Sequence, residues 1–148
     1  MFTSGSGGKA YCAGGDVVTL YKAGLGQIAN SSVLANFPAY EYLLDLALTT
    51  MKPIHIAFWN GVVMGGGVGL SCFAPIRIAT DNTVFAMPET GIGFFTDVAA
   101  SFFLPRLVGY PHEVNQFNPC LGMYLGLTGS RLKGKDLVHW GVATHYVP

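Results

Sequence analysis

The feature that most constrains the fold of this chain is an uncharged stretch of 24 residues between Lys52 and Arg77. A stretch of this length could span a bilayer as one apolar helix. However, a proline opens it, Asn60-Gly61 forms a turn dipeptide in its middle, and four glycines follow within the next eight residues. We therefore predict a buried strand before the turn and a glycine loop with a buried helix after it, and no membrane span.

The rest of the chain alternates between strand and helix signals, which predicts an α/β domain. Asp16 is a predicted helix N-cap, Asn36 is another with Pro38 in the first turn, and Asp97 is a third. Short strands are predicted over residues 1–4, 54–59, 76–79, 84–86 and 142–147. Helices are predicted over residues 17–23, 68–73, 97–104 and 133–140, and in a longer element that begins at residue 36.

The composition excludes several classes of protein. The 148 residues include eight basic and eight acidic ones, so the net charge is zero and no basic field for nucleic acid exists. Charged residues make up 11% and apolar ones 51%, which excludes a disordered chain and suggests a piece of a larger protein. The three cysteines are far apart and the four histidines lack ligand spacing, so neither a disulfide framework nor a metal site is expected.

Two common nucleotide-binding patterns fail when they are tested against the glycine-rich start of the chain. Residues 5–10 fit a degenerate dinucleotide fingerprint, but no carboxylate follows at the usual distance. Gly8-Lys9 lacks both the hydroxyl residue and the earlier glycine of a P-loop. Neither pattern predicts a nucleotide site.

Three segments, two of them glycine-rich, stand in a fixed order at residues 8–16, 64–70 and 87–97. Glycine lets a backbone N–H approach a ligand closely because no Cβ stands in the way. Two such N–H groups that point at one atom form an oxyanion hole, which stabilises a transition state by a few kcal/mol. The third segment adds carboxylates. Taken singly, each of these glycines also fits a turn or a close packing contact, so the residues alone leave both interpretations open.

These segments resemble the crotonase (enoyl-CoA hydratase/isomerase) superfamily, and within it the 3-hydroxyisobutyryl-CoA hydrolases. The resemblance covers nearly the whole chain and includes a fourth motif at residues 128–136. It implies a crotonase-type spiral of ββα units, incomplete at both ends, with residues 1–148 as a single partial acyl-CoA-binding domain. The matching motifs read KAYCAGGD, MGGGVGLS, FAMPETGIG and TGSRLKGKD.

The resemblance also implies roles for individual residues. The backbone N–H groups of Gly15 and Gly66 would form the oxyanion hole for the thioester carbonyl of an acyl-CoA. Glu89 would attack this carbonyl or activate water against it. Asp97 would orient the substrate or assist proton transfer, and Glu41 would line the substrate pocket.

One position separates the subfamilies. Hydratases of the superfamily carry a glutamate where this chain has Gly69, so the resemblance favours hydrolysis of 3-hydroxyisobutyryl-CoA in valine breakdown. The expected reaction needs no metal or redox cofactor, since coenzyme A belongs to the substrate, and the expected location is the mitochondrion. Two alternatives stay open: an enoyl-CoA isomerase or hydratase, and a catalytically silent structural subunit of a larger assembly such as a mitochondrial ribosome. A homo-oligomer is also compatible with the resemblance.

The chain departs from the hydrolase pattern at two places. Thr96 and Ala99-Ala100 replace a proline and two glycines around Asp97, so we expect the loop that aims Asp97 to shift. The segment from Tyr110 to Cys120 is about ten residues longer than the family's usual turn, and it is interpreted as a polar surface insertion or a gene-model artefact.

Overall fold

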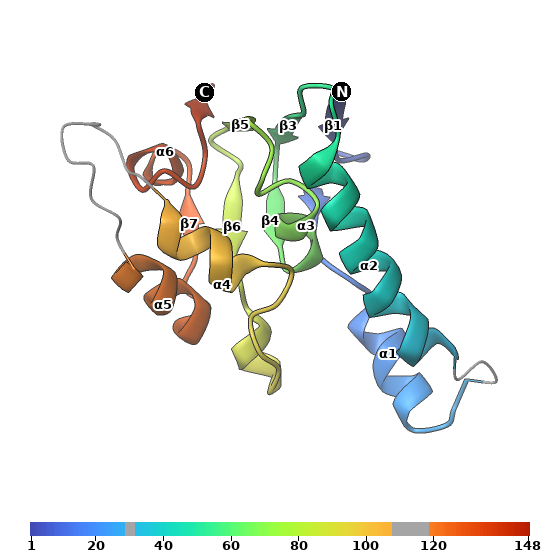
Figure 1. Cartoon of the computed structure of the whole chain (residues 1–148). Helices are drawn as coiled ribbons and strands as arrows, with labels where there is room; N and C mark the ends of the chain where they lie inside the picture. The colour runs from blue at the N-terminus through green and yellow to red at the C-terminus, as the bar shows by residue number, and fades with distance from the viewer. Residues whose placement is uncertain (29–31, 108–118) are drawn as a thin grey trace.

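The computed structural model describes residues 1–28, 32–107 and 119–148, and within them the strands form two four-stranded sheets (Figure 1). The first sheet is parallel throughout. It has the order β1 (Phe2–Ser4), β3 (Ile56–Trp59), β5 (Ile76–Ala79) and β8 (His145–Tyr146). The second sheet has the order β2 (Ala10–Cys12), β4 (Val62–Met64), β6 (Val84–Ala86) and β7 (Leu132–Lys133), with the β6–β7 pair antiparallel.

The strands from β1 to β6 enter the two sheets alternately, which gives the predicted spiral of ββα units. β1, β3 and β5 lie in the first sheet, and the strand that follows each of them lies in the second. The turn between β3 and β4 shows why glycine is needed there. Gly61 has a φ of 88°, and a Cβ at this residue would collide with the carbonyl of Lys9.

The helices lie on both sides of the strands (Figure 1). On one side, α1 (Val17–Gly24) packs against α2 (Ser32–Thr50). On the other side lie α4 (Ala100–Phe103), α5 (Pro119–Thr128) and α6 (Asp136–His139). Three short elements complete the described chain: α3 (Gly66–Gly69) lies between β4 and β5, and the 3-10 helices η1 (Glu89–Ile92) and η2 (Leu104–Arg106) lie before and after α4.

The uncharged stretch folds as β3, a turn, β4 and α3, so the predicted strand, turn and following helix are confirmed, whereas the strand β4 was not predicted. The helix is shorter and earlier than predicted, because it begins at Gly66 and ends at Gly69, and glycine adds little helix stability. No helix in the described parts of the chain is both long and apolar enough to cross a membrane.

Capping was predicted correctly at one helix and wrongly at two. The Asp16 side chain accepts from the Thr19 N–H at 3.0 Å and caps α1. However, α2 begins at Ser32 rather than after Asn36, and it continues through Pro38, which removes a single N–H donor. Asp97 does not cap α4, since α4 begins only at Ala100 and the Asp97 side chain accepts from Tyr42 instead.

Near the C-terminus, the predicted helix over residues 133–140 shortens to α6, and the strand over residues 142–147 shortens to β8. Lys133 belongs to β7, where it pairs with Val84 of the antiparallel neighbour, so pairing with the sheet delays the helix. Most of the segment from Tyr110 to Cys120 lies outside the described residues. Its last two residues begin α5.

A buried indole fixes the glycine helix against the sheets. Trp59 on β3 is fully buried, stacks on Phe85 of β6 at a centroid distance of 6.0 Å, and donates to Ser71 Oγ at 2.9 Å. The Ser71 hydroxyl donates in turn to the carbonyl of Gly67 at 2.9 Å. Burying an aromatic side chain stabilises a fold by roughly 2–3 kcal/mol. The packing therefore holds α3 rigidly at the centre of the molecule.

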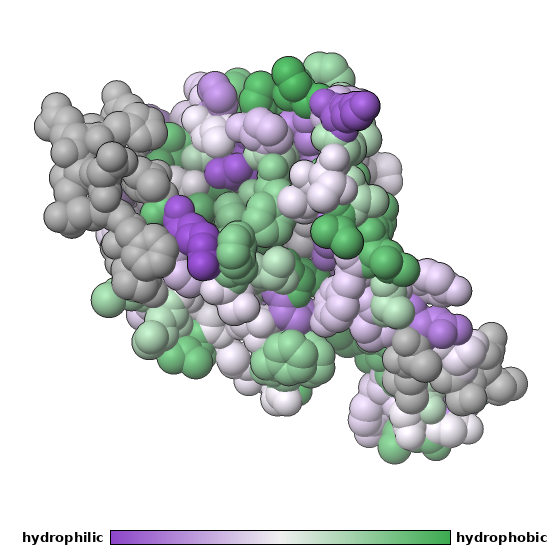
Figure 2. Space-filling view, in the orientation of Figure 1, coloured by the Kyte–Doolittle hydropathy of each residue, from purple (hydrophilic) through white to green (hydrophobic). Residues whose placement is uncertain are grey.

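Apolar side chains remain at the surface along α2 (Figure 2). Tyr40, Leu43 and Leu46 are each at least 60% exposed, and Leu44 is 49% exposed. The low charge content of the sequence thus coincides with an apolar helix face that the described residues leave open to solvent.

Candidate active site

All five residues predicted for the site line one cavity of about 660 Å³. Gly15 follows β2, Gly66 opens α3, Glu89 opens η1, Asp97 follows η1, and Glu41 lies on α2. Residues that are up to 82 positions apart in the sequence therefore converge on one space. The apolar part of the wall comes from Leu20, Phe37, Ile92 and Phe94.

The two glycine segments touch each other at the wall of this cavity. Gly14 has a φ of 98°, and a Cβ on it would lie 3.4 Å from the nitrogen of Gly66. A Cβ on Gly66 would lie 3.6 Å from the Cα of Gly14. Because Gly66 is the first residue of α3, its N–H has no acceptor within that helix. The backbones at Gly14 and Gly66 thus meet without side chains between them, and Gly15 directly follows Gly14 in the chain.

Glu89 lies directly beside these glycines. It is 8% exposed, and its Oε1 is 2.9 Å from the position that a Cβ on Gly65 would occupy. Within the described residues, its Oε2 is buried and has no hydrogen-bond partner. Burying an unpaired carboxylate costs several kcal/mol, so a residue of this kind points to a chemical task rather than to stability.

Asp97 reaches the same cavity even though its loop lacks the usual glycines. The Tyr42 hydroxyl donates to Asp97 Oδ2 at 3.2 Å. The next two residues, Val98 and Ala99, have φ values of 44° and 61°, in the region that favours glycine. The left-handed turn after Asp97 therefore forms with non-glycine residues, and the backbone there is strained. The expected shift of this loop relative to the hydrolases stays a prediction.

Helix α2 supplies the roof of the site. A Cβ on Gly66 would collide with Oε1 of Glu41, so the Glu41 carboxylate lies directly over that glycine. The Phe37 ring covers Gly15 in the same way, with its Cζ atom 2.7 Å from the position of a Cβ there. Sequence reasoning missed Phe37 and Tyr42, since only the fold brings α2 to the glycine loops.

The acidic groups of the site influence one another. Burial raises the pKa of Glu89, and the charge of Asp97 raises it further. Burial also raises the pKa of Asp97, against the opposing hydrogen bond from Tyr42. The pKa of Glu41 rises because of burial and then because of Asp97. A raised pKa is what a carboxylate needs in order to accept a proton near neutral pH.

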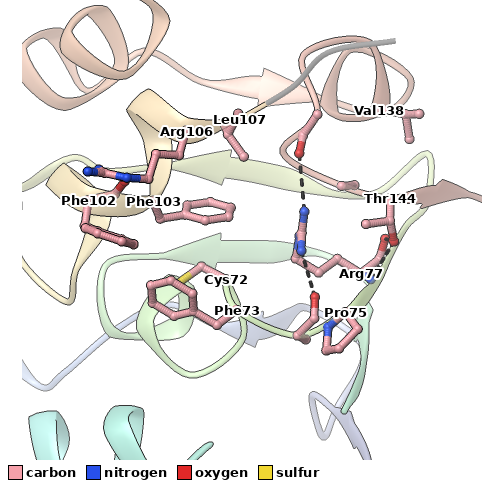
Figure 3. A pocket seen from close by; sticks show the side chains of 13 residues that line it. Cys72, Phe73, Pro75, Arg77, Phe102, Phe103, Arg106, Leu107, Val138 and Thr144 are labelled. Carbon is pink, nitrogen blue, oxygen red and sulfur yellow. Dashed lines mark hydrogen bonds between the residues drawn. The ribbon is translucent and has the colours of Figure 1, made fainter. Parts of the chain in front are cut away.

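A second cavity, of about 540 Å³, contains none of the predicted site residues (Figure 3). Arg77 of β5 extends across it. Its guanidinium donates to the carbonyls of Ala74 at 2.7 Å, Val142 at 2.8 Å and Gly141 at 3.3 Å. Burial lowers the pKa of Arg77 to about 10, so the side chain stays charged at neutral pH. The described residues contain no group of three histidine, cysteine or acidic side chains that could hold a metal ion in either cavity.

Comparison with known proteins agrees with this geometry. A family described as enoyl-CoA hydratase/isomerase matches residues 1–148. The chain belongs to this family. The matched range includes both glycine segments, η1 and the loop that carries Asp97.

Individual relatives cover the chain almost completely. It is 49% identical over 143 residues to the "Small ribosomal subunit protein mS47" of Neurospora crassa, covering 97% of this chain and 26% of that protein. It is 48% identical over 147 residues to the "3-hydroxyisobutyryl-CoA hydrolase, mitochondrial" of Xenopus tropicalis, covering 99% of this chain and 35% of that protein. The chain thus spans about a third or less of the length of these relatives, and the name of the hydrolase supports the expected mitochondrial location by resemblance.

A solved structure shares the fold. The carnitinyl-CoA dehydratase of Mycobacterium thermoresistibile matches 99% of this chain with a TM-score of 0.82 and 36% identity, over 39% of its own chain. The expected crotonase-type spiral is therefore confirmed, and the match covers only part of that larger protein.

Proposed function

We propose that this chain carries the reacting site of an acyl-CoA thioester hydrolase that acts on 3-hydroxyisobutyryl-CoA in mitochondria, within one partial acyl-CoA-binding domain. One observation supports it above all: two carboxylates, Glu89 and Asp97, line the same cavity as the glycine backbones at Gly15 and Gly66. Relatives named 3-hydroxyisobutyryl-CoA hydrolase, at 45–48% identity, support the choice of substrate.

In the proposed reaction, the thioester carbonyl oxygen accepts hydrogen bonds from the N–H groups of Gly15 and Gly66. Negative charge gathers on this oxygen as the carbonyl carbon becomes tetrahedral. Donors fixed by the backbone stabilise that charge without reorganisation, and each contributes roughly 3 kcal/mol to transition-state stabilisation. Glu41, above Gly66, contacts the acyl group.

Glu89 removes a proton from the attacking water as a C–O bond forms to the carbonyl carbon. When the tetrahedral intermediate collapses, the C–S bond breaks and the coenzyme A sulfur takes the proton from Glu89. Asp97 orients the water, and its negative charge raises the pKa of Glu89, which makes Glu89 a stronger base. The products are a carboxylic acid and a free thiol. The proposed steps use no metal or redox cofactor.

The space at Gly69 argues against a hydratase. A Cβ on Gly69 would lie 2.6 Å from Cβ of Val98 and 2.5 Å from Oδ2 of Asp45, so α3 has no room for a glutamate there. Addition of water to a double bond by a carboxylate from that position is therefore the weaker proposal.

A second candidate is a structural role in a ribosome, favoured by the relative that is named as a small ribosomal subunit protein. The two proposals make different demands on Glu89. A purely structural subunit gains nothing from a buried carboxylate oxygen without a partner, whereas a hydrolase needs it.

Release of free thiol from a panel of acyl-CoA esters tests the proposal. We expect 3-hydroxyisobutyryl-CoA to release thiol faster than crotonyl-CoA or acetyl-CoA. Migration or hydration of the crotonyl double bond without thiol release would instead indicate isomerase or hydratase chemistry. Absence of any turnover, together with co-fractionation of the native protein with ribosomal RNA, would indicate the structural role.

A further inference from the structure

Asp45 is a buried carboxylate that none of the steps above uses. It lies on α2, one helical turn after Glu41, and is 8% exposed. Both of its carboxylate oxygens are buried and lack a hydrogen-bond partner among the described residues. An isolated carboxylate in such a place is very costly when charged, so it favours the protonated form.

Asp45 stands to the end of α3 as Glu41 stands to its start. Asp45 lies one turn after Glu41 on α2, and the glycine that it covers lies about one turn after Gly66 on α3. Glu41 covers Gly66 at the start of α3, and Asp45 covers Gly69 at its end. Oδ2 of Asp45 is 2.5 Å from the place that a Cβ on Gly69 would take, and its Cγ is 3.0 Å from that place. The absence of side chains on α3 therefore creates the space for both acidic groups.

Asp45 also lines a third cavity, of about 500 Å³, that lies against the candidate active site. Asp97 is common to the linings of the two cavities. The other walls of the third cavity come mainly from apolar side chains, among them Leu46, Phe73, Phe95 and Val98. Asp97 thus stands between the proposed reacting groups on one side and the unpartnered Asp45 on the other.

We propose that Asp45 is a positioning residue: it is protonated in mildly acidic solution, and its loss of that proton around neutral pH adds a charge that acts on Asp97 and Glu41. This inference rests on the proposed function only for its effect on turnover. Burial, Glu41 and Asp97 together raise the pKa of Asp45 to about 7. The groups that share its electrostatic surroundings are Glu41, Asp97, Tyr42 and Cys72, and none of them is basic.

The consequence for catalysis follows from the sign of the charge. Below pH 7, Asp45 is neutral, and the site has to accommodate fewer negative charges around the thioester oxyanion. Above pH 7, an ionised Asp45 repels both that oxyanion and the charges of Asp97 and Glu41. We therefore expect turnover to fall by about fivefold to tenfold as Asp45 ionises.

Stability provides a readout that does not depend on turnover. The unfolded chain releases the Asp45 proton near its ordinary value of 3.8, while the folded chain releases it near 7. The folded state is therefore penalised progressively as pH rises from about 4 to 7, and the penalty is complete above 7. In Asp45→Asn this penalty is absent.

The experiment compares the wild type with Asp45→Asn, and uses Asp136→Asn as the control because Asp136 is an exposed carboxylate. Chemical denaturation between pH 4 and 8.5 gives the folding equilibrium constant, and 3-hydroxyisobutyryl-CoA hydrolysis gives kcat/KM. We expect Asp45→Asn to gain about 500-fold in folding equilibrium relative to the wild type between pH 4 and pH 8, because the pKa of Asp45 is 3.8 in the unfolded chain and about 7 in the folded one. We also expect it to keep its kcat/KM above pH 7, where the wild type declines.

Each result decides the inference. A stability difference between the two proteins that is the same at pH 4 and pH 8 would overturn it, and so would an alkaline decline of kcat/KM that persists in Asp45→Asn. If the pH-dependent stability gain appears but neither protein hydrolyses a thioester, the proposed function fails while the protonated state of Asp45 stands. A comparable gain in Asp136→Asn would assign the effect to net charge and contradict the proposal.

Discussion

Two cavities of this molecule bury charged side chains in opposite ways. In the cavity of Figure 3, Arg77 carries a buried charge, and its guanidinium donates to three backbone carbonyls from two loops. In the candidate active site, Glu89 is only 8% exposed, yet one of its carboxylate oxygens has no partner within the described residues. One charge is satisfied by its surroundings, and the other is not.

The difference separates structural from chemical roles. A buried charge with a full set of partners holds neighbouring segments together, and its removal leaves those partners unsatisfied. A buried charge without partners lowers stability, and proteins retain such a charge mainly at sites where it has a functional role. Charge and burial alone would treat the two cavities as equivalent; the hydrogen bonds distinguish them.

The largest expected effect concerns Glu89. Glu89→Gln keeps the shape of the side chain but cannot accept the proton of water, so we expect kcat for 3-hydroxyisobutyryl-CoA hydrolysis to fall about 1,000-fold. Binding of the ester, measured by calorimetry, should change by less than about threefold because the glycine backbones are untouched. An equal loss of kcat in the exposed control Asp136→Asn, or an unchanged kcat in Glu89→Gln, would contradict a chemical role for Glu89.

The next effect concerns Arg77. Arg77→Ala leaves the carbonyls of Ala74, Gly141 and Val142 without their donor, and we expect the free energy of unfolding to drop by about 3 kcal/mol. Turnover per folded molecule should not change. The matched control is Arg106→Ala, since Arg106 is exposed and stacks on Phe102 with its Cζ 3.7 Å from the ring centre.

Denaturation curves measure both arginine variants, and the control should lose less than about 1 kcal/mol. An equal loss in both variants would show that Arg77 has no special structural role. A selective loss of thioester turnover in folded Arg77→Ala would indicate that the reaction takes place in the Arg77 cavity, and this would contradict the candidate active site.

A third comparison uses neighbouring glycines of α3. In Gly66→Ala the new Cβ meets only the far end of the Glu41 side chain, which can move. In Gly67→Ala it meets the backbone carbonyl of Cys12, which cannot move without disturbing β2. We expect Gly66→Ala to lose about tenfold in kcat/KM with little loss of stability, and Gly67→Ala to lose roughly 2 kcal/mol of stability.

Thermal unfolding and thiol release separate these two glycine effects. Gly91→Ala serves as the control, because a Cβ there would meet nothing within 4 Å. A Gly66→Ala variant with full activity would contradict the placement of the oxyanion hole.

The smallest expected effect lies in the loop after Asp97. Ala99 has a φ of 61°, where alanine is strained and glycine is not, so Ala99→Gly should raise the free energy of unfolding by about 1 kcal/mol. Ala100→Gly, at the first residue of α4, should lower stability instead. Denaturation of the two variants checks this, and a loss of stability in Ala99→Gly would show that the left-handed turn is absent.

Sequence patterns predicted the parts of this fold that local chemistry determines. β5 and β6 were placed at their observed bounds because each is a short apolar run beside a turn. The start of α2 was missed because Asn36 followed by Pro38 matches the pattern of an N-cap and a first helical turn. The five site residues lie together as predicted, although their roles remain proposals.

The contacts made by α2 could not be read from sequence. Tyr42 donates to Asp97 across 55 positions, and Asp45 faces Gly69 across 24. Neither pair follows a helical or strand period, because both depend on how α2 crosses the glycine helix. Only the carboxylate spacing of Glu41 and Asp45, four residues apart on one helix face, offered a signal for the second acidic group.

A crystal structure of Glu89→Gln with bound 3-hydroxyisobutyryl-CoA tests the central claim most directly. We predict that the thioester carbonyl oxygen lies within about 3 Å of the backbone nitrogens of both Gly15 and Gly66, with the substituted side chain at position 89 beside the carbonyl carbon. A thioester bound in the Arg77 cavity, or a carbonyl oxygen that contacts neither glycine nitrogen, would contradict the account.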